Sequence, residues 1–213
     1  MNTNLILLLL ITATVFSACE KENFEYENAF NRSHEKWLEF KASSADSYRY
    51  VVTGMSWAGS RWETTITVEN GVVTARDFQF ARFNNVWMPE TGWTSAEADE
   101  ILSALNTTAD KFAEREGISF LEVLQWTERD SQLGAGAHTH SPAAALRTLD
   151  EIYDEVREWL KNPEDVRTMS FEAANNGLIS VAGGVAENCM DDCFAGISIA
   201  SIEALDQRQV ARN

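Results

Sequence analysis

The sequence predicts an α+β fold: an antiparallel sheet of two hairpin-containing halves, with a long helix packed on one face and a mostly helical insertion between the halves. Two turn motifs, Asn70-Gly71 and Asn175-Asn176-Gly177, each separate stretches that favour strands, as in β-hairpins. Between them, residues 149–160 place apolar side chains at helical spacing. Strands that are grouped before and after the helices favour α+β over alternating βα units.

The N-terminal region combines a short apolar run with a cysteine. Residues 5–16 are apolar apart from two threonines, which is too short to span a bilayer but suits a secretory signal. Phe16-Ser17-Ala18-Cys19 follows and resembles the lipobox of bacterial lipoproteins, in which cleavage leaves the cysteine as the lipidated N-terminus. We expect a signal peptide over residues 1–18 and lipidation, for example by palmitate, at Cys19. An ordinary cleaved signal or a short buried helix is the alternative.

Residues 19–27 are expected to form an acidic tether. In some bacterial groups an acidic stretch behind the lipidated cysteine directs lipoproteins to the cell surface, and Glu20-Lys21-Glu22-Asn23 resembles one. A solvated tether with no sorting role is the alternative, because charge runs are usually solvated. The expected location is the outer membrane of a bacterial envelope, facing either the periplasm or the surface.

Composition restricts the class of protein. The chain has 33 acidic and 17 basic residues and a formal net charge of −16, so its surface repels phosphate backbones and nucleic acid is not an expected partner. Seven tryptophans and eleven phenylalanines exclude wholesale disorder. We expect one domain over residues 28–205, with an insertion over 88–147 and a tail over 206–213.

The first half begins with a helix and continues as a meander. A helix from about residue 26 to residue 41 is predicted to bury Phe30, Trp37, Leu38 and Phe40. Alternating apolar positions then predict strands over residues 48–52 and 62–68. A type I′ turn at Asn70-Gly71 would pair Val68 with Val73 and Ile66 with Ala75.

The insertion is predicted to be mainly helical. Thr94 and Glu97 form a capping box before an apolar helical pattern. Ser119 and Glu122 indicate a second helix start, although the run from residue 118 to residue 126 also fits a strand. Residues 130–145 are predicted to be a loop.

The longest amphipathic helix follows the insertion. Thr148 and Glu151 form its capping box, and Asn162-Pro163 ends it. Strands over residues 168–173 and 178–185 make the second hairpin, and a last strand covers residues 197–202. Gly183-Gly184 within a strand indicates a bulge or a close backbone approach. The apolar stripe of the helix consists of Leu149, Ile152, Tyr153, Val156 and Leu160.

Cys189 and Cys193 are predicted to form a disulfide. With Cys19 lipidated, these two remain as an even pair in an oxidising compartment. A metal site would need further Cys or His at set spacings, and Asp191-Asp192 between the cysteines suit a turn.

Two other groups are candidate sites. His138 and His140 would project to one side of an extended segment, as a pair of zinc ligands can. The spacing of the sequence does not identify His34 or an acidic residue as a third ligand, so no metal or cofactor is expected. Trp57 and Trp87 lie beside turn residues and are the tryptophans expected to be exposed. They would make a platform for a sugar or peptide, or else cover the end of the sheet.

Four segments resemble a known family: WLEFKASSADSYRYVV, TTITVENGVVTA, TLDEIYDEVREWL and CMDDCFAGISIASIEAL. The family comprises secreted and lipid-anchored bacterial proteins with a domain of unknown function. The resemblance covers residues 37–75 and 148–205 and supplies no catalytic residue. We expect a non-catalytic binding or assembly module, held at a membrane by its N-terminal lipid, with a protein, small-molecule or glycan ligand. A hydrolase or metal-dependent envelope enzyme is the alternative.

Overall fold

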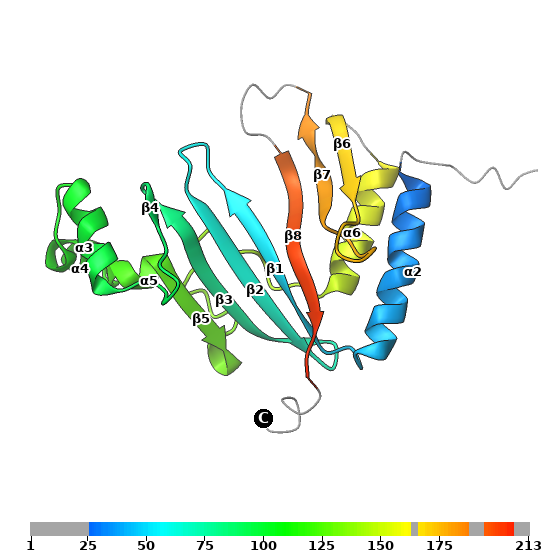
Figure 1. Ribbon diagram of the computed structural model, residues 1–213, viewed down its shortest axis with the longest axis horizontal. Coiled ribbons are helices and arrows are strands. Elements are labelled where there is room, and N and C mark those ends of the chain that lie inside the picture. Colours follow the sequence, from blue (N-terminus) through cyan, green and yellow to red (C-terminus); the bar gives the residue numbers. More distant parts are fainter. Residues whose placement is uncertain (1–25, 163–165, 188–193, 207–213) are drawn as a thin grey trace, which may run out of the picture.

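The eight strands of the described residues form one antiparallel sheet in the order β4-β3-β2-β1-β8-β7-β6, with β5 paired to β3 beside β4 (Figure 1). The computed structural model describes residues 26–162, 166–187 and 194–206. The predicted α+β class is confirmed. The strands are β1 (Tyr48–Met55), β2 (Arg61–Glu69), β3 (Val72–Phe83), β4 (Val86–Trp87), β5 (Gln125–Arg129), β6 (Val166–Glu172), β7 (Val181–Ala186) and β8 (Phe194–Ala204).

The helices fall into two groups, one at each end of the sheet (Figure 1). None of the helices within the described ranges has the length and apolar character needed to traverse a bilayer. The first group is α2 (Glu27–Ser43) and α6 (Leu149–Lys161), and the second is α3 (Ser95–Ala104), α4 (Ala109–Glu116) and α5 (Phe120–Leu124), with a 3₁₀ turn over Asp130–Gln132.

Both predicted hairpins are present, and the two halves of the sheet meet where β1 pairs with β8. Asn70 and Gly71 both have positive φ, of 51° and 79°, as a type I′ turn requires. Val68 pairs with Val73 as predicted, but Ile66 lies opposite Arg76 and not Ala75. The prediction for Ile66 is wrong because a bulge shifts the register between Thr67 and Val68.

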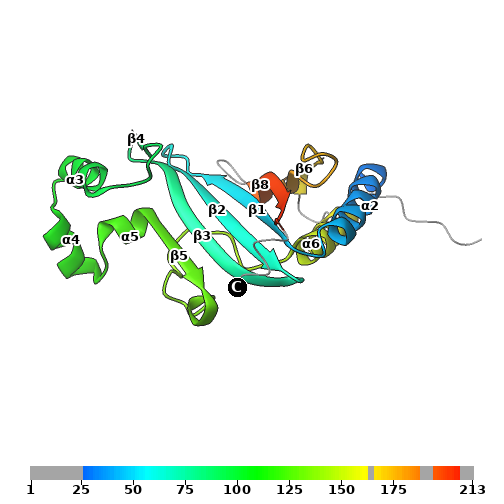
Figure 2. The same ribbon diagram turned by 60° about the horizontal axis from the view of Figure 1, so that its bottom comes forward.

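Helices α2 and α6 lie side by side against one face of the sheet (Figure 2). Every residue of the predicted α6 stripe is buried, and both predicted capping boxes, at Thr94 and Thr148, are formed. On α2, Phe30 and Trp37 are buried and Phe40 is partly buried, but Leu38 is 49% exposed. The prediction for Leu38 is wrong because it follows Trp37 by one residue, which rotates it about 100° away from the buried stripe.

The insertion packs on the other end of the sheet. Side chains from α3 and α5 form a second core cluster with β3 and β5, and Trp93 closes it by donating its indole N–H to the Phe80 carbonyl at 2.7 Å. The run over residues 118–126, which fits either a helix or a strand, contains one after the other: α5 ends at Leu124 and β5 begins at Gln125. Phe78, Phe80, Phe120, Leu124 and Trp126 are the aromatic and aliphatic centre of this cluster.

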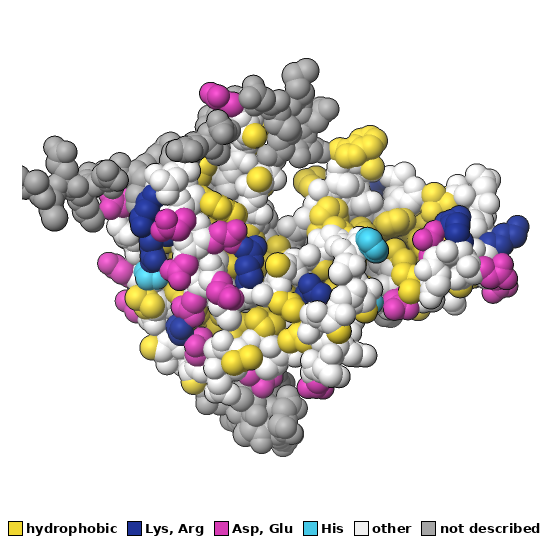
Figure 3. Space-filling view, turned by 180° about the vertical axis from the view of Figure 1, so that it is seen from behind, with side chains coloured by type: hydrophobic (Ala, Val, Ile, Leu, Met, Phe, Trp, Pro, Cys, Tyr) yellow, Lys and Arg dark blue, Asp and Glu magenta, His cyan; other side chains and the backbone are white. Residues whose placement is uncertain are grey.

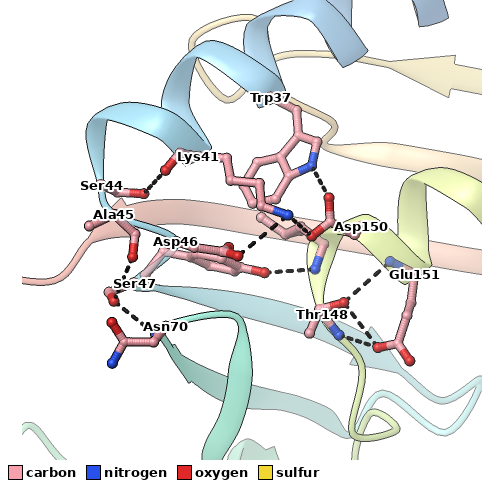
Figure 4. A network of polar contacts seen from close by, with 12 residues as sticks. Trp37, Lys41, Ser44, Ala45, Asp46, Ser47, Asn70, Thr148, Asp150 and Glu151 are labelled. Carbon is pink, nitrogen blue, oxygen red and sulfur yellow. Dashed lines mark hydrogen bonds and ion pairs between the residues drawn. The ribbon is translucent and has the colours of Figure 1, made fainter.

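A polar network fixes the link between α2 and β1 to its neighbours (Figure 4). Asp150, in the first turn of α6, accepts the indole N–H of Trp37 at 3.0 Å and pairs with Lys41 at 2.5 Å. The same ammonium lies 3.4 Å from Asp46, whose backbone carbonyl accepts the N–H of Gly71 at 2.8 Å. Each contact ties a turn or a helix end to another element, so the cluster is structural.

Candidate functional site: a cleft between the two halves of the sheet

A cleft opens where β1 diverges from β8. The two strands pair from Tyr48 and Ala204 as far as Val52 and Ile199, and the described residues beyond these do not pair across the gap. The cleft has a volume of about 1050 Å³, just above the range of about 300–1,000 Å³ for small-ligand sites. Figure 3, seen from behind, shows a notch between the two parts of the molecule with hydrophobic side chains at its borders.

The rim of the cleft is unusually apolar for a surface. Met55 is 64% exposed, Trp87 59% and Phe194 43%, and all three line the cleft. Trp62 lies deeper, with its ring across the Cα of Gly54, where an added Cβ would lie 2.4 Å from the indole. Exposed apolar groups that gather in one concave place mark a binding surface more often than single exposed residues do.

Arginines supply the polar chemistry of the cleft. Arg147 lines it and pairs with Glu155, while its carbonyl accepts the hydroxyl of Tyr50 at 2.5 Å. Arg61 also lines the cleft, and within the described part of the chain it makes no ion pair. In a chain of net charge −16, a guanidinium without a carboxylate partner favours an anionic group on a ligand.

Trp87 is held in place by a neighbouring arginine. The guanidinium of Arg82 lies 5.3 Å from the centre of the Trp87 ring, and its Nη2 donates to the Asn85 side chain at 2.7 Å. A stacked indole with restricted rotation loses less entropy when it binds a ligand.

The predicted tryptophan platform is only partly gathered in one place. Trp57 is 88% exposed in the turn between β1 and β2 and does not belong to the cleft lining, whereas Trp87 does. Both are exposed, as the neighbouring turn residues indicate. Their role as a ligand platform stays a prediction.

The histidines lie in different surroundings. His138 stacks on Trp126 with ring centres 4.1 Å apart and planes 4° from parallel, and His140 is exposed. His34 lies on α2 between Phe30 and Tyr153. Within the described ranges, no group of three or more His, Cys, Asp or Glu residues is arranged to hold a metal ion.

Three of the groups with displaced pKa values are core tyrosines, Tyr48, Tyr50 and Tyr153, and their hydroxyls have structural partners there. Burial raises the pKa of Tyr48 and Tyr50 well above the ordinary tyrosine range. The Tyr48 hydroxyl accepts the backbone N–H of Leu149 at 2.9 Å, which fixes the first turn of α6. Burial also lowers the pKa of His34, with a further contribution from Arg157.

Cys19, Cys189 and Cys193 lie outside the described residues, so lipidation and the disulfide stay predictions. Comparisons of the chain with models of known protein families, with curated protein sequences and with solved structures find no match.

Most of the residues that line the cleft were not predicted from the sequence. Met55, Arg61, Arg147 and Phe194 come from four separate segments, and nothing in their local patterns indicates that they meet. Trp87 was found because the turn residues beside it predict exposure.

Proposed function

We propose that this protein is a lipid-anchored protein of the bacterial envelope that binds a ligand in the cleft and has no catalytic activity of its own. The observation that supports binding is the gathering of Met55, Trp87 and Phe194, all exposed, around a cleft of about 1050 Å³. The proposed anchor is the lipid on Cys19, in keeping with the resemblance to lipid-anchored bacterial proteins.

The hydrophobic effect makes this surface suited to association. Removing apolar surface from water is favourable by roughly 25 cal/mol per Å². Aromatic side chains, methionine and arginine are the residues enriched in the energetically important parts of binding surfaces. Trp87, Met55 and Arg61 supply all three types in one place.

The lining also favours recognition over covalent chemistry. Its polar side chains among the described residues are those of Thr53, Arg61, Glu63, Arg147 and Ser198. A single carboxylate beside two arginines suits the binding of a charged group, whereas general acid–base catalysis usually pairs groups with opposed pKa shifts.

Site-specific photo-crosslinking in the native envelope tests this function. A photoreactive benzoylphenylalanine in place of Met55 should give a discrete adduct when cells are irradiated. The matched control places it at Leu105, which is 49% exposed at the end of α3 and does not line the cleft. Trp87→Ala should reduce the adduct formed from position 55. Equal yields from positions 55 and 105 would contradict binding in the cleft.

A further inference from the structure

We infer that the ligand of the cleft is an extended peptide, which adds to the sheet as a strand along β8. This inference rests on the proposed binding function. The peptide has alternating apolar side chains and a carboxylate.

Among the residues that the structure describes, two strand edges face each other across the cleft without pairing. β8 pairs with β7 over Phe194–Ser198 but with β1 only from Ile199 onward. β1 pairs with β2 as far as Met55 but with β8 only as far as Val52. Both stretches contribute to the lining of the cleft. Protein sheets normally cover or blunt such edges, because an unpaired edge is a template for another strand.

The backbone groups of β8 point into the cleft at alternate residues. The N–H of Ile199 donates to the carbonyl of Ser180 at 2.7 Å, so Ile199 faces β7. Hydrogen-bonded pairs alternate along an antiparallel ladder, so Ile197 also faces β7. The N–H and C=O groups of Gly196 and Ser198 therefore face the cleft.

The same alternation applies to β1. The carbonyl of Ser47 accepts the N–H of Leu205 at 3.0 Å, so Ser47 faces β8. The pairing of β1 with β2 is regular, so every second residue after Ser47 presents its backbone groups to the same side. The backbone groups of Thr53 and Met55 therefore face the cleft. The backbone of an extended peptide offers donors and acceptors at the same repeat as these two edges.

The space fits a strand. Five residues of strand, at about 3.3 Å rise, 4.8 Å strand spacing and 10 Å sheet packing distance, occupy about 800 Å³. The cleft, at about 1050 Å³, is large enough for such a segment and its smaller side chains.

The two faces of the cleft differ, which sets the side-chain pattern of the peptide. Gly54 pairs with Trp62, and Met55 pairs with Arg61, so these two pairs lie on opposite faces of the sheet. One set of alternate peptide side chains would meet Trp62 and Val52, which favours apolar groups. The other set would meet Met55 and Arg61, which favours an apolar group beside a carboxylate.

Selection from a displayed library of random peptides tests the ligand class, with the full-length chain in detergent micelles as the target. Enriched peptides should alternate apolar residues and contain an acid, and Arg61→Gln should weaken their binding about tenfold. The matched control is Arg49→Gln, because Arg49 lies at the paired end of β1 and binds Glu203 outside the cleft. Enrichment of no peptide over empty micelles would overturn the inference.

Amide hydrogen exchange on the complex tests the strand geometry. The N–H groups of Gly196 and Ser198 should gain at least about tenfold protection, while Ile197, already paired with β7, should change little. Peptides N-methylated at alternate amides should lose binding. Binding without protection of Gly196 and Ser198 would refute strand addition. An adduct at position 55 with no enriched peptide would leave the proposed binding function standing and the peptide inference refuted.

Discussion

At the scale of single residues, one hydroxyl joins helices α2 and α6 to the segment that precedes β7. The Tyr153 hydroxyl lies 2.8 Å from the Ser33 hydroxyl on α2 and accepts the N–H of Ile179 at 2.9 Å. Tyr153→Phe would leave that buried N–H without its acceptor and should lower the free energy of unfolding by about 1–3 kcal/mol. Urea denaturation measures the loss. Ser33→Ala keeps the acceptor for Ile179, so its loss should be smaller; an equal loss would contradict this assignment.

His34 should make stability depend on pH. Burial lowers its pKa from the ordinary 6.5, so the unfolded chain takes up a proton at a higher pH than the folded chain does. The folded state is therefore favoured while His34 is neutral, and this part of the stability is lost as the pH falls through and below 6.5. Urea denaturation at pH 7.5 and pH 5.5 should show a smaller difference for His34→Gln than for the wild type. His140→Gln, at an exposed position, should behave as the wild type does. Equal pH differences in all three proteins would be the contrary result.

At the scale of elements, local sequence patterns predicted the features that depend on residues close together in the chain, such as helix caps and apolar stripes. Helix α6 was predicted with its cap and all five stripe residues, because both depend on residues within a few positions of each other. Helix α4 has no fully buried residue and hence no apolar stripe to recognise, so no helix was predicted there. The register of Ile66 depends on a bulge formed with β3, which alternation along one strand does not reveal. Gly183 was predicted to mark a close approach, and an added Cβ there would lie 2.3 Å from the Ala195 carbonyl oxygen.

The two capping threonines should differ in their effect on stability. Thr148 caps α6, whose stripe is in the main core, so Thr148→Ala should cost about 1 kcal/mol of unfolding free energy. Thr108 caps α4, which has no fully buried residue and packs on the second core cluster through the partly buried Phe112, so local fraying there should leave global unfolding nearly unchanged. Chemical denaturation of the two alanine variants measures both. A larger loss for Thr108→Ala would show that α4 matters to the fold.

The predicted Cys189–Cys193 disulfide would join β7 to β8. Its closed loop is short, so its loss should cost at most about 2 kcal/mol. Five residue pairs between Val181–Val185 and Phe194–Ser198 hold the two strands together independently. Intact mass should rise by two hydrogens on reduction, and circular dichroism should be retained. A fast-reacting native thiol would instead indicate redox chemistry.

At the scale of the whole molecule, the cleft is a property of topology. Beyond Val52 and Ile199, β1 stays paired with β2 and β8 stays paired with β7, but β1 and β8 no longer pair with each other. The sheet therefore separates between its two halves. Residues about 140 positions apart in sequence, such as Met55 and Phe194, then line the same space. No periodicity along the chain contains that information, which is why the fold class was predictable and the cleft was not.

The lipid anchor and the folded part of the chain are expected to be independent of each other. The core begins at Phe30 on α2, which is fully buried, so the side chain of Cys19 should contribute nothing to the folded state. Cys19→Ala should abolish incorporation of radiolabelled palmitate and release the protein from the membrane fraction, because a stable anchor needs the acyl chains. The released variant should unfold at the same urea midpoint as the detergent-solubilised wild type. Cys189→Ala is the matched control, since it removes a cysteine but should leave labelling and membrane attachment intact. A wild type that takes up no palmitate, or a Cys19→Ala variant that stays membrane-bound, would show that the protein is held by something other than a lipid on Cys19.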